Sequence, residues 1–367
     1  MRVLLVNDYP VTSGYGAEAF VRRLAGGLSA AGDEVSIWAG EIHHEGFGRW
    51  RDIWDPQARR RLAARVEADR PDVVHFHNVT RECSASVLAA TDVPAVMTVH
   101  DHRILGIADQ VLHGPGGWLT SRGAALSGAA VRRRAKKRLA ATMAVSDELA
   151  ISLHHLGFPA VSITPVPVDE PVCLPRPVVE CTDIAVVGRL SPDKGPDVTL
   201  AAFAEIAHRH PETNLVFAGD GLMRRQLEAF ATPLGDRVQF RGRLEPDEVS
   251  RLIGRSRCVV AASVPSRRPE GSPTVVVEAA AHGRPLIASD DPGLKNAAGR
   301  LGGSVITAAL DVAALAAALD QILGDDQQAV TLGTAAKAAV FARHGVPQVT
   351  EIVRGVYRSA LTGSDRG

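Results

Sequence analysis

Two carboxylates lie at the start of an apolar stretch in the second half of the chain. Glu270 precedes a Gly-Ser-Pro sequence, and Glu278 follows among valines and alanines. Ser272 and Pro273 suit the N-cap and first position of a helix, whose first backbone N–H groups would bind an anion. A carboxylate in an apolar helix needs a partner. The pattern therefore predicts, at Glu278, either a contact with ligand hydroxyls or an ion pair with a buried arginine.

Two cations follow an apolar run earlier in the same half. Arg189 and Lys194 lie in VGRLSPDKGPD, directly after a predicted strand and beside Gly188. A guanidinium offers a bidentate fork to phosphate oxygens and an ammonium offers a compact charge, so this pair suits a diphosphate. An ordinary loop with solvated charges is the alternative. The segment FAGDG ends another apolar run, and its Gly219 is a weaker signal of the same kind.

Short Val/Ile/Leu-rich runs alternate with Ala/Arg/Leu-rich helical stretches along the whole chain. Runs such as RVLLVND and DIAVVGR are continuously apolar, which is typical of strands that are covered on both faces. Strands that alternate with helices indicate βαβ units. We therefore expect an α/β protein with two doubly wound, Rossmann-like parallel sheets, whose ligands bind at the carboxyl ends of the strands.

Length and proline content predict the domain boundaries. The 367 residues exceed one ordinary hydrophobic core, and the segment 165–180 carries five prolines without a helical period. We expect a first domain over 1–168, a linker over 169–182 and a second domain over 183–345, with the two sheets facing a central cleft. The final helix, 346–367, has an apolar face that needs a partner, for which the first domain is the candidate.

Composition and charge exclude several classes of protein. The formal net charge is zero, which argues against a nucleic-acid binder. No run approaches 18 apolar residues and the N-terminus has no signal-peptide pattern, so we expect a cytoplasmic protein. The cysteines form no C-x-x-C pair, which fits a reducing compartment without a zinc site. The first strand is not followed by G-x-G-x-x-G, which argues against a nicotinamide dehydrogenase.

Three linked motifs resemble the retaining, family-4 type of glycosyltransferase with a GT-B fold, in its glycogen-synthase-like or mannosyltransferase-like group. They are VGRLSPDKGPD with the later FAGDG, VQFRGRLEPDEV, and PEGSPTVVVEAAAHGRPLIASD. The N-terminal half matches more loosely, through SGYGAEAF, TVHD and AVSDELA. The resemblance implies transfer of a hexose-type sugar from a UDP- or GDP-linked donor to an acceptor hydroxyl. It also implies front-face attack that is assisted by the leaving diphosphate.

The resemblance makes the second domain the donor-binding one. Arg189 and Lys194 would hold the diphosphate and neutralise the leaving nucleotide. Glu278 would bind the ribose hydroxyls, Glu270 would contact the transferred sugar, and Arg243 would lie near the base. The other implied donor-binding positions are glycines and helix-start residues, namely Gly14, Gly16, Gly188, Gly219, Gly271, Ser272, Pro273, Thr274 and Val275.

The same resemblance makes the first domain the acceptor-binding one. His100, at the end of the VMTVH strand, would face the reacting centre. A satisfied strand-end histidine is the alternative interpretation. Asp101, His102 and Trp118 are candidate acceptor contacts, in a stretch that varies within the family. The acceptor is expected to be a small molecule or a saccharide.

No cofactor is expected beyond the nucleotide-sugar substrate. The chain has no D-x-D triplet, and His75 and His77 share a strand face that is more typical of packing or of a cleft wall than of a metal pair. The basic run Arg132–Arg138 would suit an anionic membrane surface. Its charges spread around the predicted helix, so a solvated face is favoured over peripheral membrane contact.

Two other functions fit the same architecture. A nucleotide-sugar epimerase would use the site without an external acceptor, and a catalytically silent module would only bind the nucleotide sugar. The glutamate pair together with the Arg…Lys loop favours transfer. A silent module would be expected to lose Glu270, Arg189 or Lys194, and all three are present.

Overall fold

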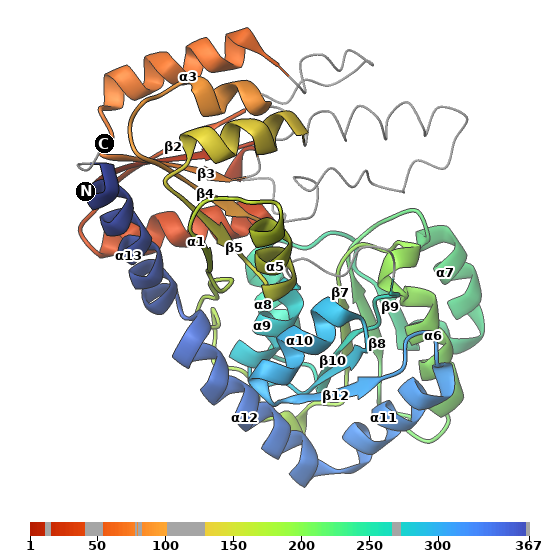
Figure 1. Ribbon diagram of the computed structural model, residues 1–367. Coiled ribbons are helices and arrows are strands. Elements are labelled where there is room, and N and C mark those ends of the chain that lie inside the picture. Colours follow the sequence, from red (N-terminus) through yellow and green to blue (C-terminus); the bar gives the residue numbers. More distant parts are fainter. Residues whose placement is uncertain are drawn as a thin grey trace, which may run out of the picture. The chain divides into compact units, whose positions relative to one another are not determined.

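The chain folds into two compact units, each built on one six-stranded parallel sheet (Figure 1). Unit 1 comprises Met1–Pro167 and Val346–Gly367, and unit 2 comprises Val168–Gly345. Two parallel sheets in an α/β chain confirm the predicted fold class. The computed structural model describes residues 1–11, 16–40, 54–77, 79, 83–100, 129–265 and 273–364.

The sheet of unit 1 has the strand order β2-β1-β3-β4-β5-β6. Its strands are β1 (Arg2–Asn7), β2 (Glu34–Ala39), β3 (Val73–His77), β4 (Ala95–Val99), β5 (Ala141–Ala144) and β6 (Val161–Ile163). The four central strands are buried along almost their whole length, whereas the two edge strands are only partly buried. Burial on both faces explains why the central runs are continuously apolar.

Among its described residues, unit 1 also has helices α1 (Gly16–Ala30), α3 (Pro56–Asp69), α5 (Asp147–His155) and α13 (Val346–Ser364), the 3₁₀ helix η2 (Ala85–Ala89) and the helical residues 129–138. The last helix packs on the first at a small-residue position. A Cβ added at Gly27 would lie 2.1 Å from Thr350 Oγ1. Arg354 Nε of α13 also lies 3.0 Å from Asp33 Oδ2, which follows α1. The C-terminal helix therefore belongs to the core of unit 1.

The sheet of unit 2 has the strand order β12-β11-β10-β7-β8-β9. Its strands are β7 (Ile184–Val187), β8 (Leu215–Ala218), β9 (Val238–Phe240), β10 (Cys258–Ala261), β11 (Leu286–Ser289) and β12 (Ser304–Thr307). Its α-helices are α6 (Pro196–Ile206), α7 (Arg224–Ala231), α8 (Pro246–Ile253), α9 (Thr274–Ala281), α10 (Pro292–Leu301), α11 (Val312–Gly324) and α12 (Asp326–His344). Short 3₁₀ helices lie at η4 (Val178–Glu180), η5 (Pro192–Lys194) and η6 (Thr232–Arg237). Central strands β7 and β8 both precede Gly-containing loops that carry predicted donor residues.

The segment predicted as a linker, 169–182, is part of unit 2. Two buried arginines hold its second half against the unit. Arg284 donates to the carbonyl oxygens of Arg176 and Gly254, the latter at 2.6 Å. Arg257 donates to the carbonyl of Val178 at 3.2 Å. Apart from the short η4, this proline-rich segment has no regular structure, and the carbonyls of Arg176 and Val178 accept hydrogen bonds from guanidinium groups of the core.

Candidate functional site

The loops after β7, β8 and β9 are hydrogen-bonded to one another at the carboxyl edge of the unit 2 sheet. Three backbone bonds link them, from Gly188 N to Ala218 O (3.0 Å), from Leu190 N to Asp220 O (3.0 Å) and from Gly219 N to Gly242 O (2.7 Å). This arrangement gathers Gly188, Arg189, Gly219 and Arg243 at one edge of the sheet. Ligands of doubly wound sheets bind at this edge.

Two glycines allow this close approach of the loops. Gly219 has a φ of 151°, and a Cβ there would lie 1.8 Å from the carbonyl oxygen of Gly188. Gly195 has a φ of 57°, and a Cβ there would lie 2.2 Å from the carbonyl oxygen of Ala262. Both contacts are to backbone, which cannot swing aside as a flexible side chain can. The loops that follow β7, β8 and β10 therefore depend on glycine to meet.

The two predicted phosphate-binding cations lie in the loop after β7. The Arg189 guanidinium is largely exposed and lies 3.2 Å from the Asp193 carboxylate. Lys194 is half buried and ends η5, before the left-handed Gly195. The N–H of Val264 donates to the Asp193 carbonyl at 2.9 Å, which ties this loop to the one after β10. An exposed ion pair of this kind contributes little to stability, so Arg189 can exchange its partner for a ligand oxygen at small cost.

Helix α9 begins one residue later than the sequence predicted. Pro273 occupies the N-cap position, with φ −74° and ψ 83°, and the first helical residue is Thr274. The predicted N-cap, Ser272, lies outside the described residues. Proline has no side-chain acceptor, so the N–H groups of the first turn receive no side-chain cap from this position. Val276 N–H donates to the Pro273 carbonyl at 3.0 Å, so an anion at this helix start would draw on the N–H groups of Thr274 and Val275.

Glu278 lies on the partly exposed face of α9. Val276, Val277 and Ala279 are buried, whereas Glu278 and Thr274, one turn earlier, are both only partly buried. Residues four apart share a helix face, so this carboxylate lies on the same side as the helix start. A carboxylate and the first N–H groups of a helix thus share one surface, which can serve sugar hydroxyls and a phosphate respectively.

A chain of hydrogen bonds fixes the far end of α9. His282 Nδ1 lies 2.8 Å from the Glu278 carbonyl oxygen, and His282 Nε2 lies 2.8 Å from Ser250 Oγ on α8. Burial lowers the pKa of His282, against hydrogen bonds to Glu278 and Ser250 that raise it. A neutral imidazole can donate from one nitrogen and accept at the other, as this geometry requires. The backbone that carries Glu278 is therefore held at its C-terminal end.

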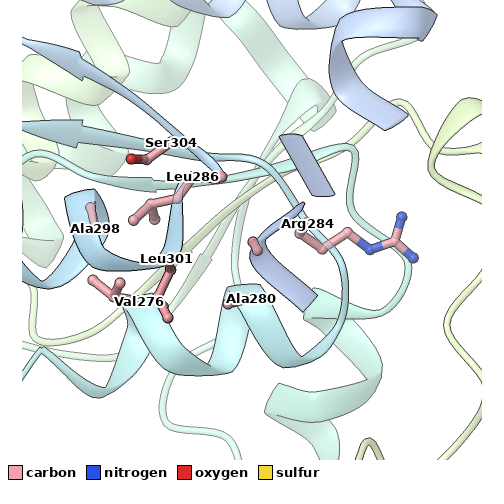
Figure 2. A pocket seen from close by; sticks show the side chains of 9 residues that line it. Val276, Ala280, Arg284, Leu286, Ala298, Leu301 and Ser304 are labelled. Carbon is pink, nitrogen blue, oxygen red and sulfur yellow. The ribbon is translucent and has the colours of Figure 1, made fainter. Parts of the chain in front are cut away.

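A small hollow lies along α9, lined by its Val276 and Ala280 (Figure 2). Its labelled lining is largely aliphatic, and Arg284 lies at one end with its guanidinium directed away from the aliphatic side chains (Figure 2). The cavity volume is about 10 Å³, room for roughly one water molecule. Sites for small molecules generally measure about 300 Å³ or more. The hollow is a packing feature between α9, α10 and α12 and is too small for a nucleotide sugar.

In unit 1, polar side chains gather at the carboxyl edge of the sheet. Asn7 and His77 are the last residues of β1 and β3 and lie opposite each other in the sheet, and His100 directly follows β4. His77 Nδ1 lies 3.0 Å from His100 Nε2, and both rings are buried. Phe20 of α1 packs edge-on against His100, with ring centroids 4.8 Å apart. Asn7 Nδ2 donates to Glu18 Oε1 of the same helix at 3.4 Å.

A third histidine connects this edge to the C-terminal helix. The His75 ring lies 4.0 Å from that of His77, centroid to centroid. His75 Nδ1 lies 2.6 Å from the Tyr357 hydroxyl of α13, and its Nε2 lies 2.8 Å from Thr98 Oγ1. The three imidazoles therefore form one buried row from Tyr357 to His100.

Burial controls the charge of this row. It lowers the pKa of His75 and of His100 to about 3. It also lowers the pKa of His77 well below the usual value, with further contributions from His75 and His100. All three rings are therefore neutral at pH 7 and act as hydrogen-bonding groups. Within the described ranges, no group of three or more His, Cys, Asp or Glu side chains is arranged to hold a metal ion.

The sequence did not predict the partners of these histidines. Tyr357 is 282 positions away from His75, and no local spacing links them. The alternation of His75 and His77 along one strand was the available signal. Several predicted site residues lie outside the described part of the chain, namely Gly14, Asp101, His102, Trp118, Glu270, Gly271 and Ser272. Gly16 is the first residue of α1.

The basic run lies in the helical residues 129–138. The Arg134 guanidinium stacks over the Trp54 ring at 4.3 Å, and Arg138 pairs with Asp92 at 2.6 Å. Part of the positive charge is therefore used in contacts within unit 1. Across the described residues, no helix is long and apolar enough to cross a bilayer.

Comparison with known proteins agrees with the predicted motifs. Residues 180–339 match the family model "Glycosyl transferases group 1", and residues 15–170 match "Glycosyltransferase Family 4". Glycogen synthase of Mycobacterium tuberculosis (strain CDC 1551 / Oshkosh) is 27% identical over 99% of this chain and 96% of its own length.

Two solved structures share the fold over almost the whole chain. Sucrose-phosphate synthase from Thermosynechococcus elongatus has a TM-score of 0.75 at 17% identity, over 99% of this chain and 100% of that one. Anabaena Alr3699/HepE in complex with UDP-glucose has a TM-score of 0.69 at 18% identity, over 98% and 100%. Together the two family models match most of the chain, one in each unit. The chain therefore belongs to the family-4 type of glycosyltransferases with the GT-B fold.

Proposed function

We propose that this glycosyltransferase moves a hexose from a nucleoside-diphosphate sugar to an acceptor hydroxyl, with retention at the anomeric carbon. The observation that carries the proposal is the carboxyl edge of the unit 2 sheet. There, the glycine-dependent loops present Arg189 and Lys194, and α9 presents Glu278 beside its first turn. These side chains match in type and order the donor contacts that the family motifs imply.

The donor diphosphate would be bound by charge from two sources. Arg189 would release Asp193 and take phosphate oxygens through its guanidinium fork, while Lys194 would supply a compact charge beside it. The N–H groups of Thr274 and Val275 would add dipoles aimed at the same anion. These groups stabilise the negative charge that develops as the bond between sugar and phosphate breaks. We propose that they do so without a bound metal ion.

The nucleoside end of the donor would be recognised by Glu278 and by the loop after β9. A carboxylate with two oxygens can accept from both hydroxyls of a ribose, and Glu278 is only partly buried on α9, where a ligand can reach it. Arg243 lies in the loop that pairs with Gly219 through Gly242, where the base would be placed. Anabaena HepE was solved with UDP-glucose, which supports a uridine donor, and a guanosine donor is the alternative.

On the acceptor side, His100 is proposed to contact the reacting groups as a neutral hydrogen-bonding partner. Its lowered pKa of about 3 favours this role over that of a cation. In a front-face transfer, the negatively charged leaving diphosphate, and not the neutral imidazole, would take the proton from the acceptor hydroxyl. The acceptor itself is proposed to be a small molecule or a saccharide.

A nucleotide-release assay tests the proposal. The protein would be incubated with UDP-glucose or GDP-mannose, with and without a panel of sugar and polyol acceptors, and free UDP or GDP would be measured. Release that depends on an acceptor is expected, and the anomeric configuration of the product by NMR would report retention. Conversion of the donor sugar without any acceptor would favour an epimerase. Binding of UDP or GDP without turnover of any donor would favour a silent module.

A further inference from the structure

His77 lies between the proposed acceptor-side residue and the interior of unit 1, and the family motifs give it no role. Its side chain is fully buried. One nitrogen, Nδ1, lies 3.0 Å from His100 Nε2. The other, Nε2, is buried and has no hydrogen-bond partner among the described residues. A buried nitrogen without a partner costs free energy, so the burial of Nε2, which has none among the described residues, needs a compensating reason.

The surroundings of His77 hold its ring in one orientation. The His75 ring packs against it in a tilted arrangement, with centroids 4.0 Å apart, and the Phe20 ring packs on it at 5.8 Å between centroids. His75 is itself fixed at both nitrogens, by Tyr357 and by Thr98. These contacts come from β3, β4, α1 and α13, so His77 presents a fixed nitrogen to His100.

The single bond between the two rings also selects their tautomers. Two neutral imidazoles share one hydrogen bond only if one donates and the other accepts. With the proton on Nδ1 of His77, its unsatisfied atom is a lone pair; with the proton on Nε2, it is a buried N–H. Among buried backbone groups, an unpaired N–H is rarer than an under-satisfied acceptor, and we apply the same preference to the imidazole. The first arrangement is therefore favoured, and it leaves the proton of His100 on Nδ1.

We propose that His77 is a positioning residue, whose Nδ1–H donates to His100 Nε2 and fixes both the orientation and the tautomer of His100. The inference rests on the proposed role of His100 in sugar transfer. The bonded Nε2 of His100 is then occupied, and Nδ1–H is the group that His100 offers to a ligand. His100 would act on the acceptor side as a hydrogen-bond donor.

Two substitutions of His77 separate donation from ring packing. His77→Phe keeps a ring that can pack against His75 but removes both nitrogens. His77→Asn places an amide N–H near the position of Nδ1. We expect His77→Phe to lower kcat on the order of 100-fold, because small misplacement of a reacting group has effects of that size. Its KM for the donor should be unchanged, and His77→Asn should recover most of the loss.

The decisive measurement repeats His77→Phe in a His100→Ala background. If His77 acts through His100, the His77→Phe substitution should cause no further loss of kcat once the His100 side chain is absent. An equal loss in both backgrounds would overturn the positioning role and leave the proposed function intact. Normal turnover of His100→Ala alone would instead overturn the proposed role of His100.

A spectroscopic test does not depend on any variant or on activity. Long-range ¹⁵N–¹H correlation spectra of the intact protein distinguish the two tautomers of each neutral histidine. The proposal expects both His77 and His100 to carry their proton on Nδ1. A spectrum with the His77 proton on Nε2 would contradict it, whether or not the variants fold.

Discussion

Replacing Gly219 by alanine tests the close approach of the loops after β7 and β8 at the carboxyl edge of the unit 2 sheet. The added Cβ would lie 1.8 Å from the Gly188 carbonyl oxygen, far inside contact distance, and the residue has a φ of 151°. A backbone conformation that is nearly restricted to glycine costs about 1–3 kcal/mol for another residue. Overpacking adds about 1–3 kcal/mol, because the clashing atom is backbone. We therefore expect Gly219→Ala to lower the stability of unit 2 by about 3 kcal/mol.

Two other glycines of unit 2 provide matched controls. Gly188 has a φ of 149° but no described atom within 4 Å of where a Cβ would lie, so Gly188→Ala should show the backbone cost without the clash. Gly299, inside α10, has ordinary helical geometry and no atom within 4 Å of its Cβ position. Gly299→Ala should therefore stabilise the protein by about 0.5–1 kcal/mol.

Thermal unfolding followed by circular dichroism measures all three variants. For a unit of this size, 1 kcal/mol corresponds to about 2–4 °C, so Gly219→Ala should unfold roughly 6–12 °C below the parent protein. Its affinity for UDP or GDP, measured by calorimetry, should also fall, because displaced loops carry Arg189 and Lys194. If Gly219→Ala melts with the parent protein and binds nucleotide equally well, the loops do not meet as described and the reasoning fails.

Three further predictions concern charge at the two sheet edges. Glu278→Gln should weaken UDP or GDP binding about tenfold with little change in melting temperature, and unchanged affinity in a calorimetric titration would remove Glu278 from the donor site. Lys194→Ala should lower kcat by about 100-fold or more while the protein stays folded, whereas near-normal turnover would indicate a solvated loop. The third prediction is that stability depends on pH through the neutral histidines. Their folded-state pKa values lie below that of the unfolded chain, so the unfolded state binds more protons as pH falls from 6.5 toward 3. Urea unfolding at pH 7, 6 and 5 should show falling stability, by up to about 1.4 kcal/mol per pH unit for each histidine, and a flat profile would contradict their neutral burial.

The strands were the most predictable part of this fold. Continuous apolar runs such as Leu4–Val6 are needed wherever a parallel strand is covered on both faces, so the pattern directly reports the burial. The linker was less predictable, because its order comes from elsewhere. Five prolines indicate a segment without helix or sheet, but they say nothing of Arg257 and Arg284, which bind its carbonyls from the core of unit 2.

The start of α9 shows why a local rule can misplace a boundary. Ser followed by Pro is a common N-cap and first helical residue, and this rule put Pro273 inside the helix. In the structure, Pro273 has a ψ of 83° and stands before the helix instead. Capping preferences describe averages over many helices, and the backbone of one residue can depart from them. The predicted partial burial of Glu278 depends only on helix periodicity, and the structure confirms it.

The two sheet edges differ in how much of their chemistry is local in sequence. At the unit 2 edge, each loop carries its own charged or glycine residue directly after its strand, so short motifs contain most of the site. At the unit 1 edge, the polar groups are held by residues from distant elements, and His75 is fixed by Tyr357 from the last helix. A motif records which side chain is present, but the protonation state of a buried imidazole depends on its neighbours in space. The role of His100 as a donor or an acceptor is therefore decided by the packing of β3, β4, α1 and α13, which the three-dimensional structure supplies.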